Sequence, residues 1–336
     1  MSVDPILTLA PIRGITDAVY RDAFARCFGG FDRAIAPFIP LRQGQPLKPG
    51  ELRQVAPDLN RGLPTIPQLL THHAPTMTAA LRELHDAGHA EANWNLGCPY
   101  PMVAGRGRGS GLLPHPDRID AILGNVLENS PVRLSVKLRL GYRNPDEFKA
   151  VLDVLNRYPL TQVILHARTA GQMYGGTVDL ARAAQALAAC RHPFEYNGDI
   201  IAPCGFRTLR GQLPGAASWM IGRGALACPF LPARLKLDSV STSDSAIDKL
   251  KPEIPPLPAP EERRRRLREF HGLLLDGYGR WLSGPGHLLD KMKEQWTWLA
   301  LAFANPRQIL SRIRHSADLA AYAASTDWIF DQPLAE

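Results

Sequence analysis

Short apolar segments recur along the first 235 or so residues, and each ends at a polar residue or a glycine-rich turn. Their starts lie about 30 residues apart, the length of one strand-plus-helix unit. The stretches between them, such as 77–84 and 119–127, carry apolar residues at helical spacing. Eight such units predict an α/β fold, a (β/α)8 TIM barrel, with a doubly wound open sheet as the alternative. The eight segments are Ile6–Ala10, Ala34–Phe38, Thr65–Leu69, Glu91–Asn95, Leu134–Lys137, Val163–His166, Phe194–Asn197 and Ser218–Ile221.

Polar residues at the ends of the predicted strands favour the barrel. Gln68, Asn95, Lys137, His166 and Asn197 lie at the C-terminal ends of five of the segments. In barrels of this kind the carboxyl ends of the strands carry the active site. One such residue is most simply a surface residue, whereas five that converge on one face predict a ligand site there.

A serine- and proline-rich stretch divides the chain. Residues 239–245 are mostly serine, and residues 251–260 hold five prolines, which lack the N–H donors that helices and central strands need. We therefore expect a catalytic domain over 1–237, a linker over 238–260 and a second domain over 261–336. Apolar residues recur every three or four positions in the tail and predict a small all-helical domain. They are Leu267, Phe270, Leu274, Tyr278, Trp281, Leu288, Met292, Trp296, Leu299 and Phe303.

Composition narrows the class of protein. The chain has 336 residues, of which 45% are hydrophobic and 21% charged, so it is globular rather than disordered. We expect no membrane span and no secretory leader, and hence a cytoplasmic protein. Five scattered cysteines without a Cys-x-x-Cys pair give no indication of a disulfide framework or a metal site. The net charge of +7 fits a mildly basic enzyme or a nucleic-acid partner equally well.

Two glycine-containing turns after the last strands predict a phosphate site. Asn197-Gly198-Asp199 follows the seventh segment and Gly222-Arg223-Gly224 follows the eighth. Barrels often bind phosphate between these loops, where glycines let backbone amides approach and an arginine adds charge. Lys137 in the barrel mouth could stabilise a reduced flavin ring. The pattern therefore predicts flavin mononucleotide (FMN), with Gln68 hydrogen-bonding the imide edge of its ring.

Cys98 lies at the same face, between Gly97 and Pro99. An ordinary thiol has a pKa of about 8.5 and is protonated at neutral pH, so Cys98 could serve as a general acid. A nucleophilic role is the alternative and would need a base. The glycine-rich stretch 105–111 that follows is interpreted as a lid.

These motifs together resemble the tRNA-dihydrouridine synthase family. The matching stretches span residues 9–224 in the family's order. They are Leu9-Ala10-Pro11-Ile12, Pro67-Gln68-Leu69, Asn95-Leu96-Gly97-Cys98-Pro99, Ser135-Val136-Lys137-Leu138-Arg139, His166-Ala167-Arg168-Thr169 with Tyr174, Asn197-Gly198-Asp199 and Ile221-Gly222-Arg223-Gly224. The tail motif Lys291-Met292-Lys293 with Trp298 resembles the RNA-binding domain of the bacterial C-type subfamily.

The resemblance implies that FMN, reduced by NADPH, reduces the C5–C6 double bond of a uridine in the tRNA D-loop. The tail favours uridine 16 over uridine 20. Cys98 would protonate C5. The residues implied to hold FMN are Ala10, Pro11, Ile12, Gln68, Lys137, His166, Asn197, Gly198, Asp199, Gly222 and Arg223. Those implied to bind the uracil or the tRNA are Asn95, Arg139, Arg168, Tyr174, His287, Lys291 and Lys293.

The chain departs from the family at a few positions. Ile12 stands where methionine is usual, Asn93 where aspartate is usual, and Met102 where lysine or threonine is common. Two other functions stay open: a flavoenzyme that acts on a free pyrimidine, and a barrel that binds tRNA without catalysis. We expect a monomer.

Overall fold

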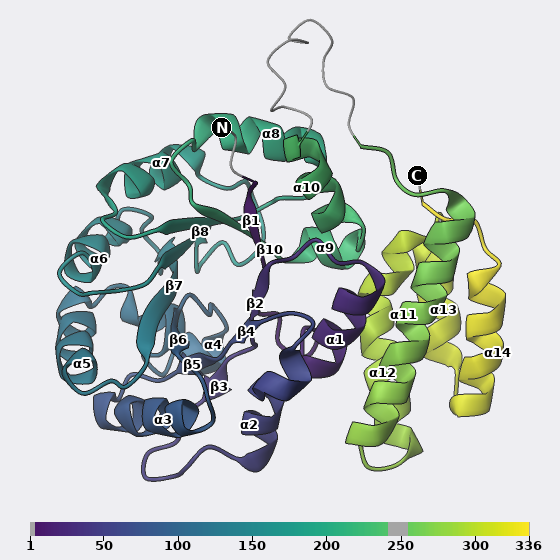
Figure 1. Ribbon diagram of the computed structural model, residues 1–336, viewed down its shortest axis with the longest axis horizontal. Helices are drawn as coiled ribbons and strands as arrows, with labels where there is room; N and C mark the ends of the chain where they lie inside the picture. The colour runs from purple at the N-terminus through teal and green to yellow at the C-terminus, as the bar shows by residue number, and fades with distance from the viewer. Residues whose placement is uncertain (1–3, 241–254, 336) are drawn as a thin grey trace, which may run out of the picture.

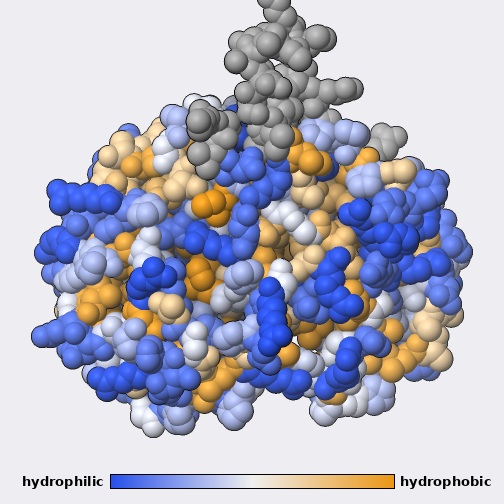
Figure 2. All heavy atoms as spheres, in the orientation of Figure 1, coloured by the Kyte–Doolittle hydropathy of each residue, from blue (hydrophilic) through white to orange (hydrophobic). Residues whose placement is uncertain are grey.

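The structure is a computed structural model that describes residues 4–240 and 255–335. A barrel of strands ringed by helices occupies most of the molecule, and the C-terminal helices stand beside it (Figure 1). In Figure 2 hydrophilic side chains are spread over both parts of the visible face, with hydrophobic residues between them. None of the helices described is both long and apolar enough to cross a membrane.

The predicted TIM barrel is confirmed. All strand pairs are parallel, in the order β3-β5-β6-β7-β8-β9-β10-β1-β2-β4. Pro67 alone separates β4 from β5, and because β4 pairs with β2 while β5 pairs with β6, the sheet closes on itself. The strands are β1 (Ile6–Leu9), β2 (Arg33–Ile35), β3 (Ile39–Pro40), β4 (Thr65–Ile66), β5 (Gln68–Leu70), β6 (Glu91–Leu96), β7 (Arg133–Gly141), β8 (Val163–Thr169), β9 (Phe194–Asn197) and β10 (Ser218–Ile221).

The helices of the barrel pack on the outer face of the strands, where alternate residues such as Leu7 and Leu9 are fully buried. Side-chain caps fix where several helices begin; Asp17, for example, accepts a hydrogen bond from the backbone N–H of Tyr20. These helices are α1 (Ala18–Cys27), α2 (Pro49–Val55), α3 (Ala74–Asp86), α4 (Pro101–Ala104), α5 (Pro116–Glu128), α6 (Glu147–Leu155), α7 (Leu180–Ala189), α8 (Pro203–Gln212), α9 (Arg223–Ala227) and α10 (Leu231–Val240).

The tail is helical, as the spacing of its apolar residues predicts. It contains α11 (Pro260–Trp281), α12 (Pro285–Leu299), α13 (Pro306–His315) and α14 (Leu319–Phe330). Most of the predicted linker, residues 241–254, lies outside the described residues. Helix α10 runs to Val240 and α11 begins at Pro260, so the domain boundaries stay a prediction.

The tail is joined to the barrel through α1. The ring of Phe270 in α11 lies edge-on to that of Tyr20, with centroids 5.3 Å apart. The hydroxyl of Tyr278 donates to the Asp17 carboxylate at 2.9 Å. Lys291 in α12 forms an ion pair with the same carboxylate at 3.2 Å. This junction fixes α12 next to the barrel mouth, where Trp298 reaches the cavity described below.

Candidate active site

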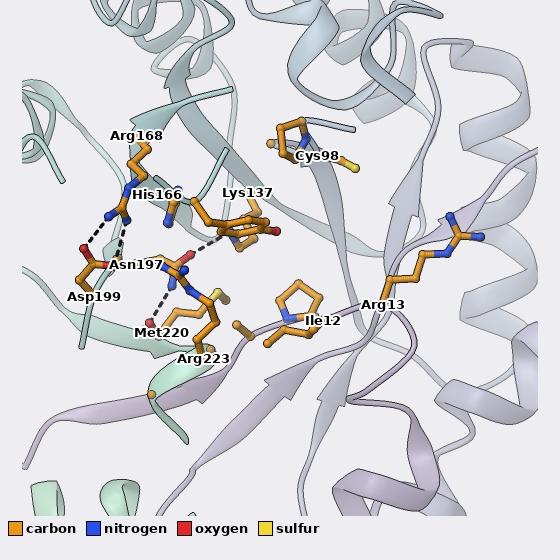
Figure 3. Close-up of a pocket in the computed structure, with 18 of the residues that line it drawn as sticks. Ile12, Arg13, Cys98, Lys137, His166, Arg168, Asn197, Asp199, Met220 and Arg223 are labelled. Atoms are coloured by element: carbon orange, nitrogen blue, oxygen red, sulfur yellow. Dashed lines mark hydrogen bonds and ion pairs between the residues drawn. The ribbon is translucent and has the colours of Figure 1, made fainter. Parts of the chain in front are cut away.

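A cavity of about 680 Å³ opens at the carboxyl ends of the strands. The carboxyl ends of β6, β7 and β8 and the loops after β1, β2, β6, β8, β9 and β10 form it, together with Trp298 of the tail. Figure 3 shows part of this lining. Most of the predicted site residues line it: Ala10, Pro11, Ile12, Asn95, Cys98, Lys137, Arg139, His166, Arg168, Tyr174, Asn197, Gly198, Asp199, Gly222 and Arg223. The barrel closure therefore brings together side chains from segments as far apart as residues 10 and 223.

Gln68 lies outside the lining of this cavity, so its predicted hydrogen bond to the imide edge of FMN stays a prediction. Its amide donates to Asn93 Oδ1 at 2.7 Å and accepts from Asn95 Nδ2 at 2.8 Å, and its side chain is fully buried. Asn93 in turn donates to the hydroxyl of Ser135 at 3.0 Å. The inward pleat of β5 places Gln68 below the rim, where it orients Asn95.

The Cys98 loop is held by hydrogen bonds at both ends. Asn95 Oδ1 accepts from the backbone N–H groups of Gly97 and Cys98, at 3.1 and 2.9 Å. The carbonyl of Cys98 accepts from the Ser110 hydroxyl at 2.8 Å. Burial raises the pKa of the Cys98 thiol, although nearby cations oppose the shift. The thiol therefore keeps its proton at neutral pH.

The glycine-rich stretch predicted to be a lid is instead folded and packed. A Cβ atom at Gly109, where φ is +56°, would lie 2.9 Å from the carbonyl oxygen of Cys98. One at Gly111 would lie 2.2 Å from the carbonyl oxygen of Ala104. These glycines thus serve close backbone packing behind Cys98, which sequence alone does not distinguish from mobility.

Lys137, His166 and Asn197 form a polar group on the consecutive strands β7, β8 and β9, next to the Cys98 loop that follows β6 (Figure 3). Lys137 Nζ donates to Asn197 Oδ1 at 3.1 Å, and Asn197 Nδ2 donates to the carbonyl of Met220 at 2.8 Å. Burial, with a contribution from Arg139, lowers the pKa of Lys137 to about 7. Burial also lowers the pKa of His166, whose Nδ1 is buried and has no hydrogen-bond partner among the described residues.

The loops after β9 and β10 pack so closely that glycine is required. At Gly198, with φ +144°, a Cβ atom would lie 2.8 Å from Val178 Cγ1. At Gly224 it would lie 2.1 Å from the carbonyl oxygen of Ile200. Beside them the half-exposed guanidinium of Arg223 forms an ion pair with Asp199 at 3.2 Å. An arginine over two glycine loops is the donor set that a phosphate group requires.

Two arginines expected to touch the substrate are almost completely buried. Arg139 donates to the carbonyl groups of Gly97, Thr169 and Met173. Arg168 forms a bidentate ion pair with Asp199 and also donates to backbone carbonyls. Most of their hydrogen-bonding capacity is therefore used within the protein.

The three tail residues predicted to bind tRNA, His287, Lys291 and Lys293, lie outside the cavity lining. His287 is exposed near the start of α12. Lys291 donates to the carbonyl of Gly14 and pairs with Asp17, so it joins the tail to the barrel. Lys293 donates to the carbonyl of Arg314 at 3.3 Å.

Some lining residues were not selected from the sequence. Arg13 lies over the ring of Phe38 at 5.5 Å, and both line the cavity, as does Met220. The positions of these residues in the sequence could have indicated a place in the site. Arg13 directly follows the motif that ends at Ile12, and Phe38 and Met220 belong to predicted strand segments. The residue types of Phe38 and Met220 do not indicate a site, since phenylalanine and methionine commonly fill cores.

Comparisons with known proteins agree with this geometry. Residues 8–254 match the family model of dihydrouridine synthase (Dus). A Rhodobacter capsulatus protein named "Probable tRNA-dihydrouridine synthase" is 30% identical over 91% of this chain and 89% of its own length. A Neisseria meningitidis "tRNA-dihydrouridine(16) synthase" is 27% identical over 68% of this chain and 71% of its own.

Among solved structures, the old yellow enzyme homologue of Zymomonas mobilis has a TM-score of 0.50. It is 11% identical and covers 68% of this chain and 87% of its own, which supports the barrel fold alone. The family assignment rests instead on the sequence matches, which cover most of the chain and agree with the arrangement of the cavity. The chain belongs to the dihydrouridine synthase family.

Proposed function

We propose that the protein is a tRNA-dihydrouridine synthase that uses FMN and NADPH to reduce a uridine in the tRNA D-loop. The observation that carries this proposal is the Cys98 thiol, which shares one cavity with Lys137, Asn197 and Arg223 in a chain of this family. FMN bound there would supply the hydride for C6 of the uracil. The Cys98 thiol would supply the proton for C5, so the C5–C6 double bond gains one hydride and one proton.

The cavity suits FMN in three respects. Arg223 and the two glycine loops suit its phosphate, and Lys137 suits negative charge on a reduced ring. The buried, unpartnered Nδ1 of His166 is left for a ligand to satisfy. Ala10, Pro11 and Ile12 line the cavity beside these groups and would contact the cofactor.

Asn95 is the described side chain best placed to act on the uracil near Cys98. Its carbonyl oxygen and one amide proton are used within the protein, which leaves a second amide proton to donate. Because the same hydrogen bonds fix the Cys98 loop, they also set where the thiol lies relative to that amide.

We propose uridine 16 as the position reduced, with uridine 20 as the alternative. The support is the tail motif at 291–298 and the relatives named as tRNA-dihydrouridine(16) synthases. A Proteus vulgaris relative named "tRNA-dihydrouridine synthase B" is equally similar, 27% identical over 86% of this chain and 85% of its own length, so mapping of the product must decide. We further propose a cytoplasmic monomer, with residues 261–336 as the RNA-binding part.

The test compares Cys98→Ala with Cys228→Ala, because both thiols line the cavity. Under anaerobic conditions NADPH should bleach the flavin absorbance of both variants. Added unmodified tRNA should restore it and yield dihydrouridine only with Cys228→Ala and the unaltered protein. We expect Cys98→Ala to lose at least about 100-fold in rate, the usual range for a missing general acid.

Three outcomes would contradict the proposal. Dihydrouridine formed at an unchanged rate by Cys98→Ala would remove the thiol from the reaction. Reoxidation by free uracil but not by tRNA would indicate an enzyme of free pyrimidines. A protein that takes up no flavin on incubation with FMN would exclude the proposed chemistry.

A further inference from the structure

The loop between β8 and α7, residues 170–179, is held in place by two buried arginines, and its Tyr174 lines the cavity. Arg139 Nη1 donates to the carbonyl groups of Thr169 and Met173, at 2.8 and 2.7 Å. Arg168 donates to the carbonyl groups of Gly175 and Gly176, at 3.0 and 2.7 Å. The backbone reaches this conformation through left-handed residues, with φ +52° at Met173 and +62° at Gly176. We call residues 170–179 the strap.

Asp199 anchors the strap to the loop after β9. Its carboxylate accepts from Arg168 Nη1 and Nη2, at 2.9 and 2.6 Å, and from Arg223 Nη2 at 3.2 Å. Arg168 is only 2% exposed, so its charge requires a partner, and the Asp199 carboxylate provides it. One carboxylate therefore links the base of the strap to the arginine of the predicted phosphate site (Figure 3).

Tyr174 at the tip of the strap lies between two cations. The guanidinium carbon of Arg139 is 5.3 Å from its ring centroid, and that of Arg223 is 5.1 Å away. The ring also lies edge-on to His166 at 6.5 Å. It is 44% exposed, so one part of it faces the open cavity.

We propose that Arg168 and Asp199 are positioning residues that hold the strap and thereby fix the Tyr174 ring at the mouth of the cavity. Arg168 acts through the strap and does not touch the substrate. Four of the hydrogen bonds that its five N–H groups can donate are already made to Asp199, Gly175 and Gly176. A ring held in advance costs less conformational entropy when the substrate binds. That the substrate is tRNA rests on the proposed function.

The experiment compares Arg168→Lys, Tyr174→Ala and the double variant. Lysine keeps the positive charge but loses the planar fork, so it cannot hold Asp199 and both carbonyls together. Arg182→Lys is the matched control. Arg182 in α7 pairs with Asp146 and with Asp179, which is the last strap residue and the N-cap of α7, but it donates to no strap carbonyl in the described structure, so the segment around Tyr174 should be unaffected.

We expect Arg168→Lys and Tyr174→Ala each to raise the KM for tRNA about tenfold, with a smaller change in kcat, and the double variant to be no worse than Tyr174→Ala alone. Chymotrypsin should cleave after Tyr174 several times faster in Arg168→Lys, and Arg182→Lys should match the unaltered protein. Additive effects in the double variant would show that Arg168 acts directly and would overturn the proposal.

The protease readout separates this inference from the proposed function. If the unaltered protein does not reduce tRNA, the proposed function fails, while the rate of cleavage after Tyr174 still tests the strap. Should Arg168→Lys not fold, Asp199→Asn replaces it, since loss of the carboxylate charge should also speed that cleavage. Cleavage at the unaltered rate in a folded variant would overturn the inference.

Discussion

Burial sets the protonation of three titratable side chains that line the cavity, Cys98, Lys137 and His166. It raises the pKa of the Cys98 thiol, lowers that of His166, and lowers that of Lys137 to about 7. The thiol therefore keeps its proton and the imidazole is neutral at physiological pH. Lys137 titrates in that range, and an anionic ligand beside it would favour its charged form.

His271 gives a prediction at the same scale, away from the cavity. It is buried in the tail, its Nε2 is 2.6 Å from the hydroxyl of Tyr322, and burial lowers its pKa from 6.5 to about 4. Below pH 6.5 the unfolded chain binds a proton that the folded chain does not, so the free energy of unfolding falls as the pH falls from about 6.5 to about 4. The loss between pH 7 and pH 5 should be about 2 kcal/mol.

The measurement is urea unfolding at pH 7 and pH 5, followed by tryptophan fluorescence. In His271→Gln the difference in unfolding free energy between the two pH values should shrink by that amount. The control is His315→Gln, which replaces an exposed histidine of the same tail. An equal pH dependence in His271→Gln and the unaltered protein would show that His271 is not the group responsible.

At the scale of elements, α1 is the principal barrel helix in contact with the tail, alongside α2, where Arg53 lies over the ring of Trp281. The Asp17 carboxylate caps α1, accepts a hydrogen bond from the hydroxyl of Tyr278 and forms an ion pair with the ammonium group of Lys291. One carboxylate therefore connects α1, α11 and α12. Gln295 in α12 donates in turn to the Tyr278 hydroxyl at 2.9 Å. This polar cluster sets the position of α12, and with it that of Trp298 beside the cavity.

Lys291→Met should therefore destabilise the molecule, whereas Lys293→Met on the same helix should not. The side chain of Lys291 is 16% exposed, and its Nζ forms an ion pair with Asp17 Oδ2 at 3.2 Å. Lys293 Nζ donates only to the carbonyl oxygen of Arg314, at 3.3 Å, among the described residues. Loss of a hydrogen bond to a charged group costs about 2 kcal/mol. Thermal melting measures the difference, and equal melting temperatures for the two variants would contradict the structural role of Lys291. Affinity for tRNA, measured in parallel, tests the RNA-binding role predicted for both.

At the scale of the whole molecule, most of the net charge of +7 lies in residues 1–260, because the tail 261–336 holds 11 basic and 10 acidic residues. The active-site cavity opens on the barrel that carries this charge. The proposed substrate is far larger than this cavity, so much of its contact must lie outside. Phosphate contacts of that kind release counterions and depend steeply on salt.

The KM for tRNA should accordingly rise at least about tenfold between 50 and 200 mM salt, as expected for a protein that neutralises several phosphates. Bleaching of the flavin by NADPH provides the control, because a small cofactor makes few phosphate contacts and should depend on salt much less. Steady-state kinetics over this range measure both. A KM for tRNA independent of salt would argue against an extended RNA surface.

The sequence by itself determined the order of strands and helices, the face that carries the site and the identity of most lining residues. These follow from short-range periodicity and from polar residues such as Lys137 and Asn197 at strand ends, which any closure of the barrel brings together. Only the tertiary structure decided what those side chains bond to. Gln68 accepts a hydrogen bond from Asn95, which is 27 residues away in the sequence, and Arg168 bonds to Asp199 at a separation of 31 residues. Lys291 bonds to the carbonyl of Gly14, 277 residues away. A polar group can satisfy a ligand or a distant part of its own chain, and which of them lies within hydrogen-bonding distance is set by packing, which local pattern does not encode.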